Sequence, residues 1–351
     1  MNFFSKGSFW RRLLIVWVLI ALTALPVPYL SMKPGPVFNT LGNLGQEEFL
    51  QVSGSQTYPT TGRLDMTTVR EVGGPETPIT LFEAVSGWIN PDVAVVPRRA
   101  FYQQEVSEVE VEEQSLRAFA SSQDIALAAA LRHLKLPFSE KVIVVDVIKG
   151  MPAAEFLKAD DQILEVSGLP VDSVGAAIKA VRANAPGSEV IINYLRNGKQ
   201  AQARIVAVKT DGLPGQGSIG AYLTSEVDSV IKAKFADQNV GGPSAGLVFT
   251  LAIIDVLTPG DLTGNSHIGV TGTITTTGEV GGIGGVKQKM IGARKAGATV
   301  FLAPEENCDE IGQLTPKGLK VVPVSSIDQA VRVLKQLNLD SQAVVPTCTA
   351  K

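Results

Sequence analysis

The first long apolar run in the sequence covers residues 13–30, LLIVWVLIALTALPVPYL. It carries no charge over 18 residues, which is close to the shortest length at which a helix crosses a bilayer. Three basic residues, Lys6, Arg11 and Arg12, precede the run, whereas Lys33 is the only basic residue among the thirty that follow it. This asymmetry predicts an uncleaved transmembrane signal anchor that leaves the remaining chain outside the cytoplasm. A cleaved signal peptide is the alternative, although no Ala-x-Ala sequence follows the apolar part.

A second long apolar run, Leu247 to Leu257, has the length of a buried helix rather than of a strand. Beyond it, residues 299–303 and 319–324 have strand character, and residues 327–337 have a helical period. Alternating strands and helices predict an α/β or α+β domain. A segment rich in glycine and proline at 211–218 marks its start.

Between the first apolar run and residue 136, the pattern of hydrophobic and polar residues is weaker. Residues 39–42 and 63–69 have the character of short strands, and residues 81–89 form a short amphipathic pattern. The acidic stretch at 104–118 indicates a solvated helix face or a linker, with a calcium site as the less favoured alternative. A helix is expected over 121–136. We expect a small β-rich juxtamembrane region here, without catalytic groups.

The pattern of hydrophobic and polar residues changes again at residues 137–210. A strand at 142–147 is followed by Gly150-Met151-Pro152-Ala153-Ala154, and Asp160-Asp161 precedes the next strand. A helix at 174–183 and a strand at 189–195, which turns at Asn197-Gly198, complete the order.

This order of elements resembles a PDZ domain of the bacterial protease-associated type, which usually has Gly-Asp where this chain has Asp160-Asp161. The resemblance implies that an extended C-terminal peptide binds by strand addition at a sheet edge. The groove is then expected between strand 142–147 and helix 174–183, with the carboxylate loop at 137–142. The alternative is a PDZ fold that only packs against its neighbours.

Composition adds few constraints. The chain has 351 residues, enough for two or three domains, and 45% of them are hydrophobic. A net charge of −3 gives no electrostatic basis for binding nucleic acid. The two cysteines, Cys308 and Cys348, are able to form a disulfide outside the cell but are not required to.

The candidate nucleophile is Ser244, within Gly242-Pro243-Ser244-Ala245-Gly246 at the start of the predicted helix. A helix N-terminus favours the negative charge that develops on a nucleophilic oxygen and on an oxyanion. A serine also needs a base, and the chain has only two histidines, His133 and His267. A lysine serves when burial or a nearby positive potential keeps it neutral.

These residues resemble the proteolytic domain of the Lon serine–lysine peptidases. The nucleophile motif is complete at 242–246, and the lysine motif appears as Gly284-Gly285-Val286-Lys287-Gln288-Lys289. Lys287 follows Ser244 by 43 residues, the family's spacing, so the resemblance implies a Ser244–Lys287 dyad with Lys289 as the competing base. It also implies that Thr271 supports the lysine. Two departures from the family pattern are Gly241 and Thr273, where many members carry acidic residues.

The order of the segments along the whole chain resembles that of the membrane-anchored PDZ–Lon-like proteases of Gram-positive bacteria. The predicted fold class is therefore α/β and α+β multidomain, organised as a cytoplasmic N-terminus (1–12), a transmembrane helix (13–30), a juxtamembrane region (33–136), a PDZ domain (137–210), a Lon-like proteolytic domain (218–340) and a tail (341–351). The resemblance implies a serine endopeptidase that cleaves unfolded polypeptides or polypeptides with exposed C-termini. It also implies contact with the lipid bilayer and assembly into a homo-oligomer.

No cofactor and no metal site is expected. The one Gly-Lys pair, Gly198-Lys199, is followed by Gln200 and so departs from the nucleotide-binding loop pattern, which predicts cleavage without ATP. Two alternatives remain open. One is a catalytically silent PDZ adaptor or scaffold. The other is an α/β-hydrolase-type esterase, in which His267 and Asp255 or Asp261 would complete a triad with Ser244.

Overall fold

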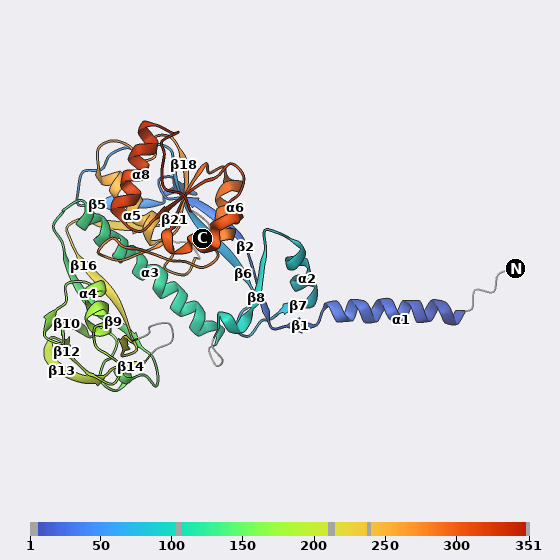
Figure 1. Ribbon diagram of the computed structural model, residues 1–351, viewed down its shortest axis with the longest axis horizontal. Helices are drawn as coiled ribbons and strands as arrows, with labels where there is room; N and C mark the ends of the chain where they lie inside the picture. Colours follow the sequence, from blue (N-terminus) through green and yellow to red (C-terminus); the bar gives the residue numbers. More distant parts are fainter. Residues whose placement is uncertain (1–5, 103–106, 210–214, 237–239, 349–351) are drawn as a thin grey trace.

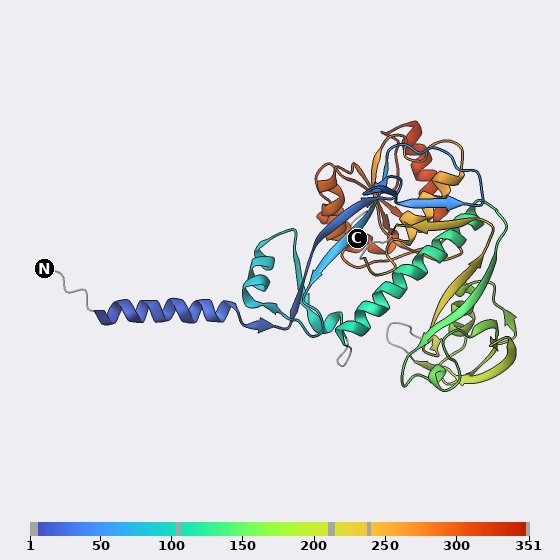
Figure 2. The same cartoon turned by 180° about the vertical axis from the view of Figure 1, so that it is seen from behind.

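The computed structural model describes residues 6–102, 107–209, 215–236 and 240–348, which form two bodies and a projecting helix (Figure 1). The projecting helix, α1 (Lys6–Thr23), lies at the N-terminal end. Helix α3 (Glu108–His133) runs along the boundary between the two bodies, as the reverse view also shows (Figure 2).

The larger body is built on a six-stranded sheet in the order β22-β21-β18-β6-β2-β8. Its strands come from two distant parts of the chain: β2 (Tyr29–Asn39), β6 (Arg63–Val72) and β8 (Ala94–Pro97) from the first, and β18 (His267–Val270), β21 (Val300–Pro304) and β22 (Lys320–Val324) from the second. β6 pairs in parallel with β18, from Arg63↔His267 to Met66↔Val270. The predicted separate juxtamembrane region is therefore wrong, because its strands β6, β2 and β8 form one half of the proteolytic sheet.

Helices cover both faces of this sheet. Alternation along the strands sends Leu302 and Val322 to the face covered by α3, α5 (Gly246–Leu257) and α8 (Ile327–Leu339), and Phe301 and Val321 to the face covered by α6 (Val286–Ala296). Helix α5 is buried on all sides except at Val256, which confirms the helix predicted from the apolar run. The predicted strands at 299–303 and 319–324 and the helix at 327–337 are also confirmed.

The smaller body is the PDZ-like sheet, in the order β13-β12-β10-β9-β16. Its main elements are β9 (Ser139–Val147), β10 (Gln162–Val166), α4 (Val174–Arg182), β12 (Glu189–Arg196), β13 (Lys199–Val206) and β16 (Ala221–Asp228). The hairpin between β12 and β13 turns at Asn197-Gly198, as predicted, with φ of 52° and 74°. The chain enters this body from α3 and returns from β16 to the larger body, so the PDZ-like body is an insertion.

The departure at Asp160-Asp161 has a structural reason. Asp160 has a φ of 69°, in the left-handed region where glycine is usual and Asp is among the better tolerated alternatives. Asp161 is 1% exposed and receives two hydrogen bonds from the Arg196 guanidinium, at 2.8 and 2.6 Å. The first aspartate thus replaces a glycine, and the second anchors the sheet.

The remaining elements are short. Besides α2 (Leu81–Ile89), which matches the amphipathic pattern predicted there, they are β1 (Pro26–Val27), β3 (Asn43–Leu44), β4 (Glu47–Glu48), β5 (Leu50–Ser53), β7 (Ile79–Thr80), η1 (Arg98–Ala100), η2 (Pro152–Glu155), β11 (Leu169–Pro170), β14 (Val208–Lys209), β15 (Gly217–Ser218), β17 (Lys232–Phe235), β19 (Thr273–Ile274), β20 (Val280–Gly281), η3 (Glu305–Asn307), α7 (Cys308–Ile311) and η4 (Gly312–Leu314). The acidic stretch, predicted as a solvated helix face or a linker, is, where described, the first turns of α3, which agrees with the helix face.

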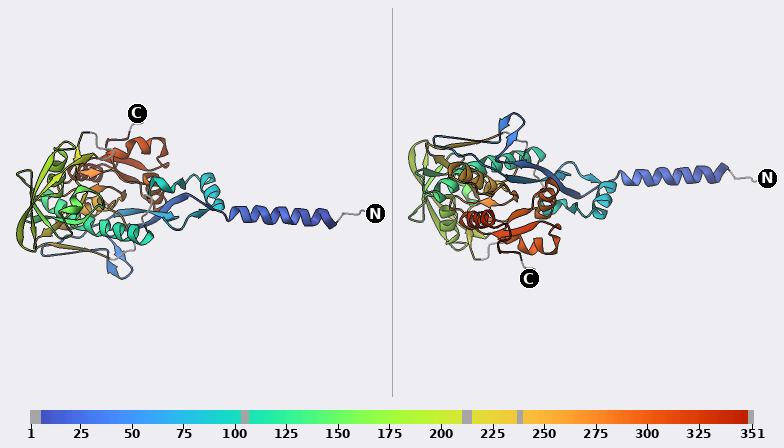
Figure 3. Two further views of the ribbon diagram at one scale, coloured as in Figure 1. Left: turned by 90° about the horizontal axis from the view of Figure 1, so that it is seen from below. Right: turned by 90° about the horizontal axis from the view of Figure 1, so that it is seen from above.

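The N-terminal apolar run differs from its prediction. The helix begins at Lys6 and ends at Thr23, and the chain then enters β1 and β2, so residues 13–30 are not one helix. None of the helices in the described part of the chain combines the length and the apolar character needed to cross a membrane. Further views show α1 standing clear of both bodies (Figure 3).

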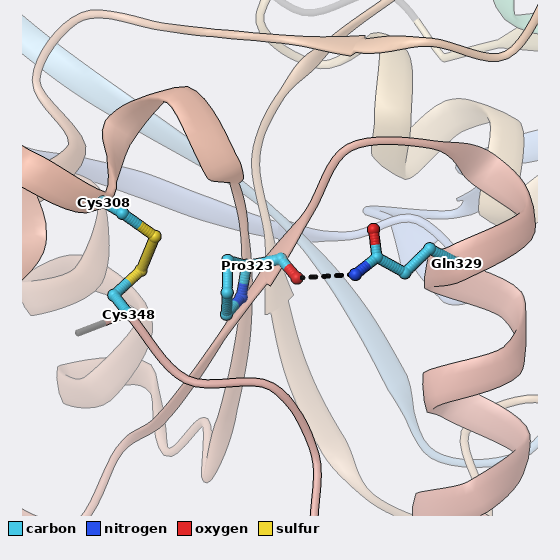
Figure 4. The surroundings of a disulfide bond; sticks show 4 residues. All are labelled: Cys308, Pro323, Gln329 and Cys348. Atoms are coloured by element: carbon cyan, nitrogen blue, oxygen red, sulfur yellow. Dashed lines mark hydrogen bonds between the residues drawn. A yellow bond between two sulfur atoms is a disulfide. The ribbon is translucent and has the colours of Figure 1, made fainter.

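The C-terminal segment is fastened rather than loose, as far as Cys348. A disulfide joins Cys308 in α7 to Cys348, beside the strand and helix linked by the hydrogen bond from Gln329 Nε2 to the Pro323 carbonyl (Figure 4). Val345 is 8% exposed and belongs to the main core. The predicted loose tail is therefore wrong for residues 341–348, while residues 349–351 lie outside the described part.

Candidate active site

Ser244 lies on the loop that leads into α5, whose N-cap is Ala245. Gly242 has a φ of 85°, which glycine adopts without strain, and its N–H donates a 2.9 Å hydrogen bond to the Ser115 carbonyl of α3. A side chain at Gly241 would collide with the Ser115 hydroxyl, so α3 takes the space that an acidic residue would need there. The loop that carries Ser244 is thus shaped by a helix from the first half of the chain.

Lys289 reaches the serine. Its Nζ lies 2.7 Å from Ser244 Oγ and 3.1 Å from Thr271 Oγ1. Thr271, at the end of β18, is fully buried, and its hydroxyl donates a 3.3 Å hydrogen bond to the Ser244 carbonyl. The backbone N–H of Gly272 donates to the same carbonyl at 2.9 Å. The structure therefore brings the hydroxyls of Ser244 and Thr271 together around the Lys289 Nζ.

Lys287, the lysine predicted to be the base, does not take this place. It lies two residues from Lys289 on α6, and successive helical residues are about 100° apart, so the two side chains leave the helix on opposite sides. Lys287 is half-buried and is absent from the lining of the cavity at Ser244. The prediction of Lys287 is corrected to Lys289.

The apolar spacing of α6 does not separate the two lysines. The buried apolar residues of the helix include Val286, Met290 and Ala293. Lys289 is three residues after the first of these and four before the last, but Lys287 is three before Met290, so both lysines border the same stripe. Counting residues from Ser244 could not separate the two lysines, since the intervening loops do not fix the distance through space.

The Lys289 ammonium is 4% exposed and has no carboxylate within salt-bridge distance among the described residues. Burial lowers its pKa from 10.5 to about 8, because desolvation disfavours the charged form, and Glu71 opposes this by raising the pKa. A lysine with a pKa near neutrality exists partly as the free amine. That form has the lone pair a general base needs.

Two backbone donors stand beside the serine. Among the described residues, the N–H groups of Ser244 and Ala245 have no hydrogen-bond acceptor, whereas the next two N–H groups donate to the carbonyls of Pro243 and Gly272. Free N–H groups at a helix start can stabilise an oxyanion. Gly246, the last residue of the motif, has another role, because a Cβ there would press on Ile274 at 2.8 Å.

The site opens into a cavity of about 550 Å³. Much of its wall comes from the first part of the chain, which the sequence pattern assigned no role: Met32, Pro36, Met66, Thr67, Thr68, Val69, Arg70, Glu71, Phe101, Ser115 and Phe119. Thr273, the second departure from the family pattern, also lines it. These wall residues were missed because the pairing of β6 with β18 joins residues about two hundred positions apart.

The histidines lie elsewhere. His267 Nε2 contacts the buried carboxylate of Asp65 at the start of β18, and Thr271 follows the other end of this strand. His133 Nδ1 lies 2.6 Å from Asp328. The esterase alternative, which needs His267 at Ser244, does not agree with this placement. In the described ranges there is also no group of three or more His, Cys, Asp or Glu that could hold a metal ion.

The PDZ-like body places its free edge differently from the prediction. β16 pairs with β9 over its whole length, from Ala221↔Val147 to Asp228↔Ser139, so β9 is an inner strand. The sheet ends at β16, which packs near α4. The predicted carboxylate loop at 137–142 leads into the inner strand and is corrected. The turn before β16 lies beside α4 instead, with the Gly217 N–H donating to the Asn184 carbonyl at 2.8 Å.

Comparisons with known proteins find both kinds of domain in the chain. The Lon protease (S16) C-terminal proteolytic domain matches residues 221–337, and a PDZ domain matches residues 109–206. The chain is 29% identical over 184 residues to Lon protease 1 of Bacillus subtilis, covering 50% of this chain and 23% of that protein. It is 38% identical over 94 residues to the Lon protease of Chloroflexus aggregans, covering 26% and 11%.

The PDZ domain of an SdrC-like protein from Listeria monocytogenes is 34% identical, covering 23% of this chain and 85% of that one, with a TM-score of 0.22. The chain spans less than a quarter of the length of the two Lon proteases that it matches. Both domain matches are separate from each other along the chain. The chain therefore contains a C-terminal proteolytic domain of the Lon protease (S16) family, a serine peptidase domain, together with a PDZ domain.

Proposed function

We propose that the protein is a serine endopeptidase whose nucleophile is Ser244 and whose general base is Lys289. The observation that carries this proposal is the 2.7 Å separation between Ser244 Oγ and the buried Nζ of Lys289. A solvated lysine would be charged and unable to accept a proton, but the lowered pKa of Lys289 removes this obstacle.

In the proposed reaction, the neutral Lys289 amine accepts the hydroxyl proton as Ser244 Oγ attacks the scissile carbonyl. The N–H groups of Ser244 and Ala245 then stabilise the oxyanion. Lys289, now an ammonium, returns its proton to the leaving amine, and water attacks the acyl-enzyme with the same lysine as base. Thr271 holds the Lys289 Nζ, since its hydroxyl accepts from Nζ and donates to the Ser244 carbonyl.

The proposed substrates are polypeptides that are unfolded or have exposed C-termini, and their cleavage needs no ATP. The PDZ domain supports this proposal, since such domains bind extended peptides at a sheet edge. In this protein, the edge proposed for the peptide is that of β16, beside α4.

The test is digestion of casein by the full chain without nucleotide, beside Ser244→Ala. We expect cleavage by the parent alone, with a rate that falls as pH decreases through about 8, because protonation of Lys289 removes the base. A cleavage rate that stays constant from about pH 6 to about pH 9, on either side of that pKa, would contradict Lys289 as the base. Absence of cleavage by a folded parent that still binds C-terminal peptides would favour the adaptor function instead.

We also propose that the protein works at the cell membrane with its catalytic part outside the cytoplasm. Two observations support this location. Helix α1 presents exposed apolar side chains at positions 13–18, 20 and 22, and the chain forms the Cys308–Cys348 disulfide, a bond typical of oxidising compartments. Extraction of cell membranes at high pH, followed by protease treatment of intact cells, tests it. Recovery of the chain in the soluble cytoplasmic fraction would contradict it.

A further inference from the structure

A second cavity lies beside the nucleophile loop. It has a volume of about 380 Å³ and lies between α3, the PDZ sheet and Pro243. Its apolar lining comes from all three: Ala118, Ile125, Val145, Tyr222, Leu223 and Pro243. Pro243, the residue that precedes Ser244, also lines the catalytic cavity.

The walls of this second cavity are held in place from both bodies. On one side, the Ser115 carbonyl of α3 accepts the hydrogen bond from Gly242, next to Pro243. On the other, the hydroxyl of Ser121 on α3 contacts that of Thr224 on β16. These contacts are six residues apart on α3, a rise of about 9 Å along the helix. Less than two helical turns therefore connect the PDZ sheet to the nucleophile loop.

A second set of contacts fixes the junction of the two bodies. Arg132, near the end of α3, forms a 2.9 Å ion pair with Glu140 of β9 and donates a hydrogen bond to the Thr276 carbonyl. Glu140 also accepts a 2.6 Å hydrogen bond from Ser225 of β16, and its side chain is 2% exposed. These contacts hold the PDZ sheet against α3, so the sheet forms a fixed part of the cavity wall.

We propose that this second cavity is a substrate subsite that takes a large apolar side chain of the polypeptide being cleaved. The proposal rests on the proposed peptidase function and deepens it. The occupant is the substrate because Pro243, next to Ser244, lines both cavities, and an extended chain advances only about 3.3 Å per residue. A residue a few positions from the scissile bond therefore reaches it.

The chemistry of the lining sets the class of side chain. Apolar groups on three elements match Leu, Phe, Met or Trp, whose burial away from water is favourable. Tyr222 is 52% exposed at the rim and offers an aromatic face to the incoming chain. Folded proteins bury their large apolar side chains, so a subsite of this kind selects unfolded segments.

The test uses internally quenched peptides derived from a casein segment cleaved by the full chain. For each position of the peptide in turn, one version with Leu and one version with Gly at that position are compared. Ala118→Trp fills the cavity, and Ala120→Trp is the matched control, since residue 120 is exposed on the same helix. We expect Ala118→Trp to lower kcat/KM at least about tenfold for the peptide with Leu at one position, and to leave its Gly counterpart within about twofold of the parent.

A binding measurement separates this inference from the proposed function. Fluorescence anisotropy of the same labelled Leu and Gly peptides is measured on the Ser244→Ala chain with and without Ala118→Trp. The inference requires Ala118→Trp to weaken the Leu peptide at least about tenfold and to spare the Gly peptide. Tyr222→Ala, a change at the rim, is expected to reduce the preference for Leu in the same assay. Equal effects on both peptides, or no effect on either, would overturn the subsite even if Ser244-dependent cleavage is found.

Discussion

The two bodies of this protein are built in opposite ways. The PDZ-like body is formed from one continuous stretch, and its buried carboxylate, Asp161, is neutralised by the Arg196 guanidinium. The proteolytic body is formed from two stretches on either side of that insertion, and its buried ammonium, Lys289, contacts only neutral hydroxyls. A buried charge with a partner serves the fold, whereas one without a partner has a shifted pKa and is available for chemistry.

The largest expected effect concerns the way the bodies are assembled. A fragment of residues 218–351, which contains the whole matched proteolytic domain, lacks β6 and with it the buried Leu64 and Met66. We expect it not to fold cooperatively, because β18 loses its neighbour in the middle of the sheet. A fragment of residues 137–230 retains every strand of the PDZ sheet and its own core, so we expect it to fold.

Circular dichroism with thermal unfolding distinguishes these outcomes. A sigmoidal transition for the smaller fragment and none for the proteolytic fragment is expected. If the 218–351 fragment unfolded cooperatively as a monomer, the contribution of the N-terminal strands to the proteolytic body would be much smaller than the sheet order indicates.

The next effect separates the two lysines of α6. Lys289→Ala removes the proposed base, and we expect cleavage of casein to fall about 10²–10⁴-fold. Lys287→Ala is the matched control and is expected to stay within about twofold, since Lys287 does not line the cavity. Binding of a C-terminal peptide to the PDZ-like body should be unchanged in both variants. The reverse ranking of the two lysines would return the catalytic role to Lys287.

The sequence predicted local elements well and long-range assembly poorly. The hairpin at Asn197-Gly198 and helix α5 follow from local turn chemistry and from a single apolar run, so each is visible within its own segment. The pairing of Arg63 with His267 has no local signature, because the whole PDZ-like body lies between the two strands in the sequence. The serine and the threonine of the proposed site follow from sequence motifs. The choice between Lys287 and Lys289 depends on which side chain reaches Ser244 in space, and residue spacing along the chain does not give that.

A third effect tests the paired charge of the PDZ-like body. Arg196→Met leaves the Asp161 carboxylate buried without a counter-charge, and we expect the free energy of unfolding of the 137–230 fragment to fall by about 3–5 kcal/mol. Arg204→Met is the control, because its ion pair with Glu189 is exposed and is expected to contribute less than about 1 kcal/mol. Urea titration of the two variants gives the comparison. Equal losses of unfolding free energy in the two variants would mean that the buried Asp161–Arg196 pair stabilises the fold no more than the exposed pair does.

The smallest effect has the opposite sign and concerns the unpaired charge of the proteolytic body. The folded pKa of Lys289 lies near 8 and the ordinary value is 10.5, so below pH 8 the folded state carries the full cost of the buried charge, about 3 kcal/mol. Between these values the unfolded chain binds more protons, so this cost declines as pH rises. Lys289→Met removes the cost and loses hydrogen bonds worth about 1 kcal/mol net, so we expect the variant to be more stable by about 2 kcal/mol at pH 7. The advantage should disappear by about pH 10. Urea titrations of parent and variant at both pH values measure it, with Lys287→Met as the control that shows no such change. A variant that is less stable than the parent at pH 7 would show that Lys289 stabilises the folded state and does not destabilise it.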